Sequence, residues 1–256
     1  GLVGSEMCIR DRGCAGALLQ GIFANPLAEP SIIGVSSGGA VFASGLLAIA
    51  SLAGVERSYG FLKWGTALAA FIGALLTTLL VYSLSRVQGK TVVVNLILVG
   101  VAINAMAGGF VTLFSFIGGT MAQSQVVFWQ LGSLAGAGWS SAVITLIITV
   151  IGIVIACLCA PKMDLLALGE NQARHLGVNV ERFRLCVIIL VAALVGVGVA
   201  FAGVIAFVGL IVPHAIRLII GPQHKWLLPT SAFGGAFVLL VADTCARTII
   251  STAELP

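Results

Sequence analysis

Long apolar runs separated by short polar segments constrain this chain more than any other feature of its sequence. Residues 13–24 form about half a run, and complete runs cover roughly 32–54, 61–84, 92–117, 140–160, 184–200, 203–220 and 228–250. A helix needs ~20 residues to cross the hydrocarbon core of a bilayer, which most of these runs approach or exceed. Only 9% of the residues are charged, against about 25% in soluble domains. The sequence therefore predicts an all-α, polytopic membrane helical bundle with about eight spans.

Glycine content and the placement of the charges describe this bundle further. The chain has 32 Gly among 256 residues, and small residues let membrane helices approach closely. Its thirteen Lys and Arg lie between the apolar runs and form no basic face, so the +4 net charge does not indicate nucleic-acid binding. The six Cys and three His show neither a disulfide framework nor a metal-ligand spacing. We expect a tightly packed bundle in the lipid bilayer with buried thiols, no metal site and no nucleic-acid partner.

The basic residues give the orientation, because loops rich in Lys and Arg stay in the cytosol. If the segment at 25–31 is cytosolic, eight basic residues lie inside and three outside. Those inside are Arg86, Lys90, Lys162, Arg174, Arg182, Arg184, Arg217 and Lys225, and those outside are Arg57, Lys63 and Arg247. This orientation places the charged segment at 162–184 in the cytosol.

That charged segment predicts a short amphipathic helix outside the bilayer. Asp164 is placed to cap a helix that ends before Gly177. The apolar side would carry Leu165, Leu166, Ala173 and Leu176, and the polar side Glu170, Asn171, Arg174 and His175. A helix of this kind between two membrane runs predicts a docking surface for a cytosolic protein.

Two short motifs match enzyme signatures without the structural context that those signatures need. Gly34-Val-Ser-Ser-Gly38 fits the G-x-S-x-G pattern of hydrolases but opens an apolar run, so we interpret its small residues as helix packing. Gln88-Gly-Lys-Thr91 resembles the end of a P-loop, but Leu84 stands where the first Gly is required. We expect no catalytic residue and no nucleotide site in this chain.

Several polar or kinking residues interrupt the apolar runs. Asn104 is the clearest lone polar group, and either an interhelical hydrogen bond or a place on a transport pathway would explain it. Asp243 and Arg247 stand four residues apart, which favours a structural pair near the outer end of a span over a proton relay. Pro213 predicts a kink, and we interpret His214 beside it as a structural or interface residue.

The predicted outer segment at 118–140 contains two tryptophans, Trp129 and Trp139. Tryptophan is enriched in the aromatic belt at membrane interfaces. The pattern therefore favours a surface helix lying at the lipid headgroups over a substrate-stacking site.

Residues 1–12 differ in character from the rest of the chain. They hold four charges and lack the apolar core that follows the basic end of a signal peptide. We interpret them as a foreign or misassembled segment.

Several motifs, found in the same order, resemble those of the FecCD/BtuC family of ABC importer permeases. They are Asn25-Pro-Leu-Ala-Glu-Pro30, Gly34-Val-Ser-Ser-Gly38, Leu168-Gly-Glu170, Gly209-Leu-Ile-Val-Pro-His214, Ala242-Asp243 and Ala253-Glu-Leu-Pro256. The resemblance implies a BtuC-like type II permease domain over 13–256. It also implies that terminal helices of the family are missing at both ends of this chain.

The resemblance further implies partners and a location. It predicts a homodimer with the substrate path at its axis, in the bacterial inner membrane. Two cytosolic ATP-binding-cassette ATPases would use ATP and Mg, and a periplasmic binding protein would deliver the substrate. Arg57 and Arg247 are weak candidates for meeting that binding protein. No cofactor is expected on this chain itself.

The family's functional segments can be carried over to residues of this chain. Coupling helices at about 164–182 would dock into the ATPases, and the loop from Arg86 to Val94 would form a cytoplasmic gate. The ATPase-coupling candidates are Leu168, Gly169, Glu170, Arg174, Leu176 and Gly177. The translocation and gate candidates are Asn25, Pro26, Ser36, Ser37, Lys90, Thr91, Asn104, Pro213 and His214.

The function that these resemblances imply is import of an iron chelate, either a ferric siderophore or heme. A vitamin B12 importer is the alternative. An ion-coupled secondary transporter would need several buried acids or broken helices, and the predicted spans offer only Asp243. A membrane-embedded hydrolase would need a catalytic constellation that the sequence lacks.

Overall fold

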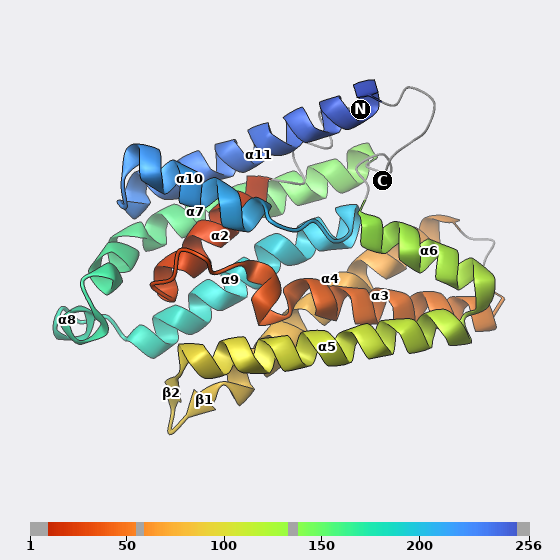
Figure 1. The fold of residues 1–256 in the computed structure, drawn as a ribbon, viewed down its shortest axis with the longest axis horizontal. Coiled ribbons are helices and arrows are strands. Elements are labelled where there is room, and N and C mark those ends of the chain that lie inside the picture. Colours follow the sequence, from red (N-terminus) through yellow and green to blue (C-terminus); the bar gives the residue numbers. More distant parts are fainter. Residues whose placement is uncertain (1–9, 55–58, 133–137, 250–256) are drawn as a thin grey trace.

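The structure is a computed structural model, and it describes residues 10–54, 59–132 and 138–249. The elements are α2 (Arg10–Ile22), η1 (Pro30–Ile33), α3 (Val35–Leu52), α4 (Tyr59–Leu84), β1 (Arg86–Val87), β2 (Lys90–Thr91), α5 (Val93–Ile117), α6 (Gly119–Leu131), α7 (Trp139–Ala167), α8 (Glu170–His175), α9 (Val180–Ala202), α10 (Val208–Ile220) and α11 (His224–Ile249). The long helices run side by side along one direction, with α8 and the hairpin β1–β2 at one end (Figure 1). The predicted helical bundle is thus the architecture of the described residues.

Among the described residues, six helices are long and apolar enough to cross a membrane. They are α3, α4, α5, α7, α9 and α11. The predicted count of about eight is not confirmed, because α2 and α10 have 13 residues each. The apolar run predicted at 203–220 is shortened by an irregular segment, 203–207, which ends at Phe207 with a φ of 67°. α10 therefore begins only at Val208.

Helices α2 and α9 form the centre of the bundle. In α9, 67% of the membrane-length window is buried, the highest share among the six long helices, and residues 11–20 of α2 are all buried. α3, α4, α5 and α6 lie on one side of this pair, and α7, α10 and α11 lie on the other (Figure 1). In α9 the buried residues from Val187 onward are apolar or glycine, as such a central position requires, whereas α2 also buries Asp11, Arg12 and Gln20.

Glycines allow the closest helix contacts, as the small-residue interpretation of Gly34 to Gly39 predicts. A Cβ on Gly38 of α3 would lie 2.4 Å from the Gly73 carbonyl oxygen of α4, and one on Gly39 would lie 2.8 Å from Val199 of α9. A Cβ on Gly16 of α2 would lie 1.8 Å from the Gly209 oxygen of α10. These backbones can approach so closely only because no side chain stands between them.

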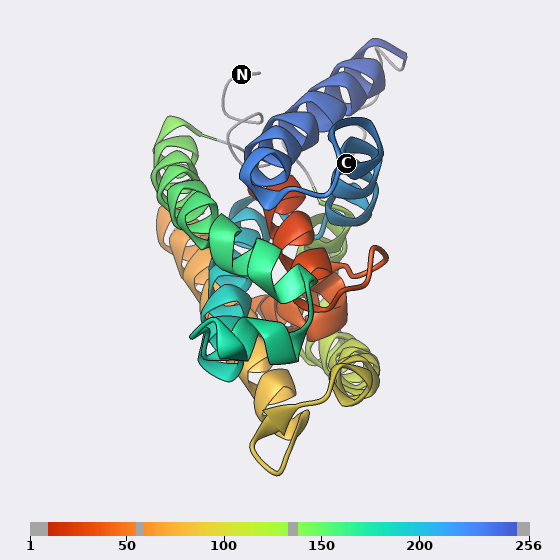
Figure 2. The same cartoon turned by 90° about the vertical axis from the view of Figure 1, so that its left-hand side faces the viewer.

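A two-residue hairpin connects α4 with α5 and projects from the bundle (Figure 2). Arg86 pairs with Thr91 and Val87 with Lys90. Gln88 and Gly89 between them have φ angles of 50° and 79°. Positive φ at both central residues is typical of the type I′ turn, whose twist suits a tight hairpin.

The structure corrects the prediction for the charged segment at about 164–182. Asp164 does not begin a helix, because α7 continues through Pro161 as far as Ala167. The segment consists of the end of α7, the six-residue helix α8 and the start of α9. Asp164 instead accepts a hydrogen bond from the backbone N–H of His224, the first residue of α11, at 3.0 Å. Its carboxylate thus satisfies one of the unpaired donors at the start of a different helix.

The surface-helix prediction for 118–140 needs correction at Trp129. Its side chain packs against the buried core of the bundle. Trp139, at the start of α7, is 75% exposed and is the one that suits an interfacial position. Of the segment interpreted as foreign, residues 1–9 lie outside the described ranges, and residues 10–12 form the first turn of α2.

Candidate functional site

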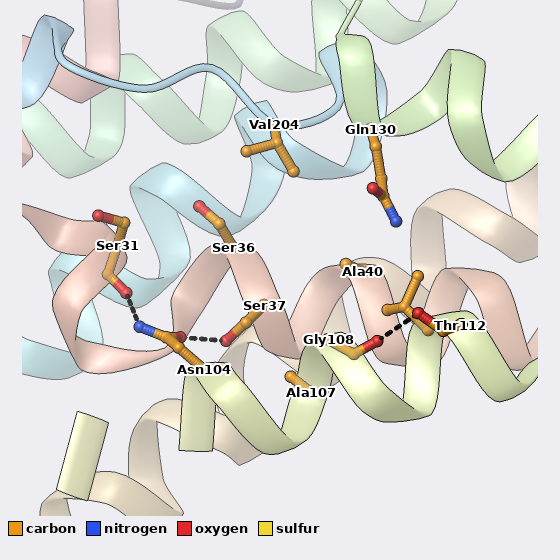
Figure 3. A pocket seen from close by; sticks show the side chains of 11 residues that line it. Ser31, Ser36, Ser37, Ala40, Asn104, Ala107, Gly108, Thr112, Gln130 and Val204 are labelled. Atoms are coloured by element: carbon orange, nitrogen blue, oxygen red, sulfur yellow. Dashed lines mark hydrogen bonds between the residues drawn. The ribbon is translucent and has the colours of Figure 1, made fainter. Parts of the chain in front are cut away.

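A polar pocket of about 480 Å³ lies between η1, α3, α5, α6 and the segment before α10 (Figure 3). Its polar lining comes from hydroxyl and carboxamide side chains, and no charged residue lines it in the described part of the chain. The lining residues include Ser31, Ser36, Ser37, Asn104, Thr112 and Gln130. Such a pocket can offer hydrogen bonds to a neutral or weakly polar ligand without the cost of desolvating a charge.

Asn104 of α5 joins two other elements at this pocket. Its Nδ2 donates to the Ser31 carbonyl oxygen of η1 at 3.1 Å, and its Oδ1 accepts from the Ser37 hydroxyl of α3 at 2.6 Å (Figure 3). The sequence left two explanations of Asn104 open, an interhelical hydrogen bond and a place on a transport pathway. The geometry shows the interhelical hydrogen bonds, and Asn104 also lines the pocket. Its place on a transport pathway stays a prediction.

We predict that Asn104→Leu weakens ligand binding at this pocket more than it lowers stability. Interhelical hydrogen bonds in membranes contribute about 0.6 kcal/mol on average, so the fold should persist. Loss of one hydrogen bond to a ligand, about 1 kcal/mol, would weaken apparent affinity roughly fivefold. Ligand binding at varied ligand concentration measures that change in affinity. Ser115→Ala on the same helix is the control, because its hydroxyl donates to the Val111 oxygen of its own helix.

The loop after α2 contributes a contact that sequence reasoning missed. Glu29 Oε1 accepts a hydrogen bond from the Phe207 N–H at 2.9 Å, so the loop anchors the start of α10. The predicted gate residues Asn25 and Pro26 lie in this loop, where Asn25 Oδ1 accepts from the Leu27 N–H. Neither residue lines the pocket. The acid and the N–H that it binds are 178 residues apart, and no local pattern links them.

The other translocation candidates lie apart from the pocket. Pro213 is buried inside α10, and His214 beside it is partly buried. Lys90 and Thr91 belong to the hairpin. The Asp243–Arg247 pair stays a prediction, since the Arg247 side chain lies outside the described part of the structure.

A surface formed by α8 and its flanks gathers all six predicted ATPase-coupling residues. Leu168, Gly169, Glu170, Arg174, Leu176 and Gly177 are exposed there. Leu176 was expected on the buried side, but it is 61% exposed and Leu168 is 62% exposed. This surface thus offers both apolar and charged side chains to a partner.

A buried arginine lies behind this surface. Arg184 of α9 is 2% exposed, and its Nη2 donates to Glu170 Oε1 of α8 at 2.7 Å. Its Nη1 lies 3.4 Å from Glu181 Oε1. Glu181 Oε2 accepts from both the N–H and the hydroxyl of Thr91, at 3.1 and 2.7 Å. Sequence reasoning used Arg184 only as a cytosolic charge and missed this network.

Comparison with known proteins decides the family. A sequence model of the FecCD transport family matches residues 13–256. The chain belongs to the FecCD transport family.

Three curated permeases are similar in sequence over most of this chain. The hemin transport permease HmuU of Yersinia pestis is 40% identical over 249 residues, covering 95% of this chain and 73% of that protein. The vitamin B12 import permease BtuC of Vibrio vulnificus is 38% identical, covering 94% of this chain and 70% of that protein. The cobalamin permease BtuC of Halobacterium salinarum is also 38% identical, covering 96% of this chain and 62% of its own length.

Solved structures agree with this FecCD fold. An inward-facing metal-chelate-type ABC transporter superposes with a TM-score of 0.86 at 30% identity, covering 99% of this chain and 79% of that one. PsaBC from Streptococcus pneumoniae, solved with a Fab, has a TM-score of 0.60 at 18% identity over 96% of this chain and 82% of its own, a likeness of fold alone. This FecCD-family chain is thus a multi-pass membrane permease of the ABC transporter type.

Proposed function

We propose that this chain is the membrane-spanning subunit of an ATP-driven importer for an iron chelate, a ferric siderophore or heme. The observation that carries the proposal is the α8 surface, where Leu168 and Leu176 are exposed beside Glu170 and Arg174. An ATPase of the cytosol is the partner that such a surface fits in this family. The 40% identity to a hemin permease and the likeness to a metal-chelate transporter support the substrate class.

In this mechanism, a homodimer in the bacterial inner membrane receives the chelate from a periplasmic binding protein. ATP and Mg bind to the partner ATPases, and this chain itself binds no cofactor. Closure of the ATPases moves α8, and the bundle alternates between outward and inward access. The pocket beside Asn104 supplies hydroxyl and amide groups to the passing substrate.

Vitamin B12 import is the alternative, favoured by the 38% identity to BtuC of Vibrio vulnificus. A neutral, polar pocket suits the amide-bearing surface of a corrinoid as well as the rim of an iron chelate. An ion-coupled transporter is less well supported. Of the three acids in the six membrane-length helices, Asp164 and Glu181 lie in end turns of α7 and α9, which leaves Asp243 of α11 for such a mechanism.

ATP hydrolysis by the intact transporter in liposomes tests the proposal. We expect a co-purifying ATPase whose turnover rises when heme or a ferric siderophore is supplied with its binding protein. Stimulation by cobalamin alone would select the vitamin B12 alternative. Uptake that follows an ion gradient, without any ATPase partner, would refute both importer assignments.

A further inference from the structure

The hairpin, α8 and the start of α9 are joined by one continuous set of polar contacts. Arg184 lies at its centre, nearly inaccessible to solvent, with one guanidinium nitrogen on Glu170 and another on Glu181. The second oxygen of Glu181 accepts from Thr91 in β2. A single carboxylate therefore bridges the buried arginine and the hairpin.

These contacts persist because leaving the buried charge of Arg184 unpaired would be costly. Removing one partner of a buried ion pair is strongly destabilising, so Glu170 and Glu181 are constrained to remain beside Arg184. Thr91 binds Glu181 through two donors, and hydrogen bonds to an ionised acceptor are among the stronger ones. Separation of the hairpin from α8 would break at least one of these contacts, whereas a common displacement of the hairpin, α8 and the start of α9 would break none.

The hairpin is also continuous with the pocket. β2 ends at Thr91 and α5 starts at Val93, so a displacement of the hairpin acts directly on the helix that carries Asn104. Rigid helices are among the elements that can carry coupling between separated sites. The network thus connects the surface at α8 with the pocket through the hairpin and α5.

We propose that Arg184 and Glu181 are positioning residues that make the hairpin move as one body with α8. This inference rests on the proposed function, since it assumes that an ATPase moves α8. Arg184 and Glu181 act on transport through Thr91 and Glu170, and touch neither substrate nor nucleotide.

The direct test compares distances in the intact transporter with and without trapped ATP. Spin labels on Val87→Cys in the hairpin and Gln172→Cys in α8, both exposed positions, report their separation. We expect this separation to stay constant while labels on α8 and on α11 change theirs. A hairpin-to-α8 distance that changes with nucleotide would overturn the proposal.

Thr91→Val gives a second test that spares the buried charge. The isosteric side chain removes the hydroxyl donor to Glu181 and leaves the backbone donor. We expect the amount of substrate transported per ATP hydrolysed to fall about fivefold, which is the low end of the range of coupling factors between two sites. We also expect the distribution of distances between the two labels to broaden. Thr78→Val is the matched control, because the buried Thr78 hydroxyl donates to the Ala74 oxygen of its own helix.

The outcomes separate this inference from the proposed function. If the unaltered transporter shows no ATP-dependent uptake, the proposed function fails. If uptake is ATP-dependent and Thr91→Val behaves like Thr78→Val in both coupling ratio and label separation, the network has no positioning role and only the inference fails.

Discussion

Glu170→Lys should abolish uptake and lower the free energy of unfolding by about 2 to 3 kcal/mol, whereas Arg174→Glu should leave the fold intact. The two residues form an ion pair at 3.5 Å, with side chains 48% and 40% exposed. Glu170 alone also binds the buried Arg184. A lysine at position 170 would place a second positive charge beside a guanidinium that cannot reach water.

The expected loss in the free energy of unfolding lies at or below the lower end of the range for breaking a buried ion pair. Glu181 remains to compensate Arg184, and Glu170 is half exposed, so solvent screens part of the effect. An exposed pair such as Glu170–Arg174 contributes about 0 to 1 kcal/mol, which sets the limit for Arg174→Glu.

Thermal unfolding in detergent, membrane content and ATPase binding distinguish the two variants. Arg174→Glu should keep a normal unfolding transition and lose affinity for the ATPase, because it changes only the docking surface. Glu170→Gln is the control for charge, since it keeps an acceptor oxygen near Arg184 and should be intermediate in stability. Equal destabilisation by Glu170→Lys and Arg174→Glu would contradict the buried network.

The sequence predicted the elements whose signal is local. Apolar runs located the long helices, because a helix that crosses lipid must be apolar over its whole length. The exposed polar side of α8 followed from the charges between Glu170 and His175. The short motifs around Gly34 and Asn25 indicated the family, and the family match over 13–256 confirms it.

The errors concern residues whose partners are distant in sequence. Asp164 is of a residue type that commonly caps the helix directly after it, yet it binds the first N–H of α11, 60 residues later. Leu176 has the helical spacing of a buried residue, but the chain leaves α8 at that point and the side chain is exposed. Periodicity assigns a side chain to a face of a helix and does not say what covers that face.

The network at Arg184 had no sequence signal for the same reason. Glu181 and Thr91 are separated by 90 residues, and no sequence pattern links the two. The sequence presents Arg184 as one of eight predicted cytosolic charges, yet its side chain is only 2% exposed in the fold. A buried charge is detectable in sequence when it interrupts an apolar run, whereas Arg184 lies at the edge of one.

Gly100→Ala should destabilise the protein by about 1 to 3 kcal/mol and displace η1 from α5. A Cβ at Gly100 would lie 1.9 Å from the Ile32 carbonyl oxygen, which is backbone and cannot rotate away. The displacement would also stretch the bond between Asn104 and the Ser31 carbonyl, since Ser31 and Ile32 are adjacent in η1. Uptake should therefore fall together with stability.

Gly109→Ala on the same helix is the matched control. Apart from the neighbouring backbone of its own helix, no atom of the described residues lies within 4 Å of a Cβ at Gly109. Alanine is favoured over glycine in a helix by up to about 1 kcal/mol, so this variant should unfold at an equal or higher temperature than the unaltered protein. Thermal unfolding in detergent and transport assays of both variants measure the difference. If Gly100→Ala were as stable and as active as Gly109→Ala, η1 would not be held against α5, and the pocket beside Asn104 could not have the shape described.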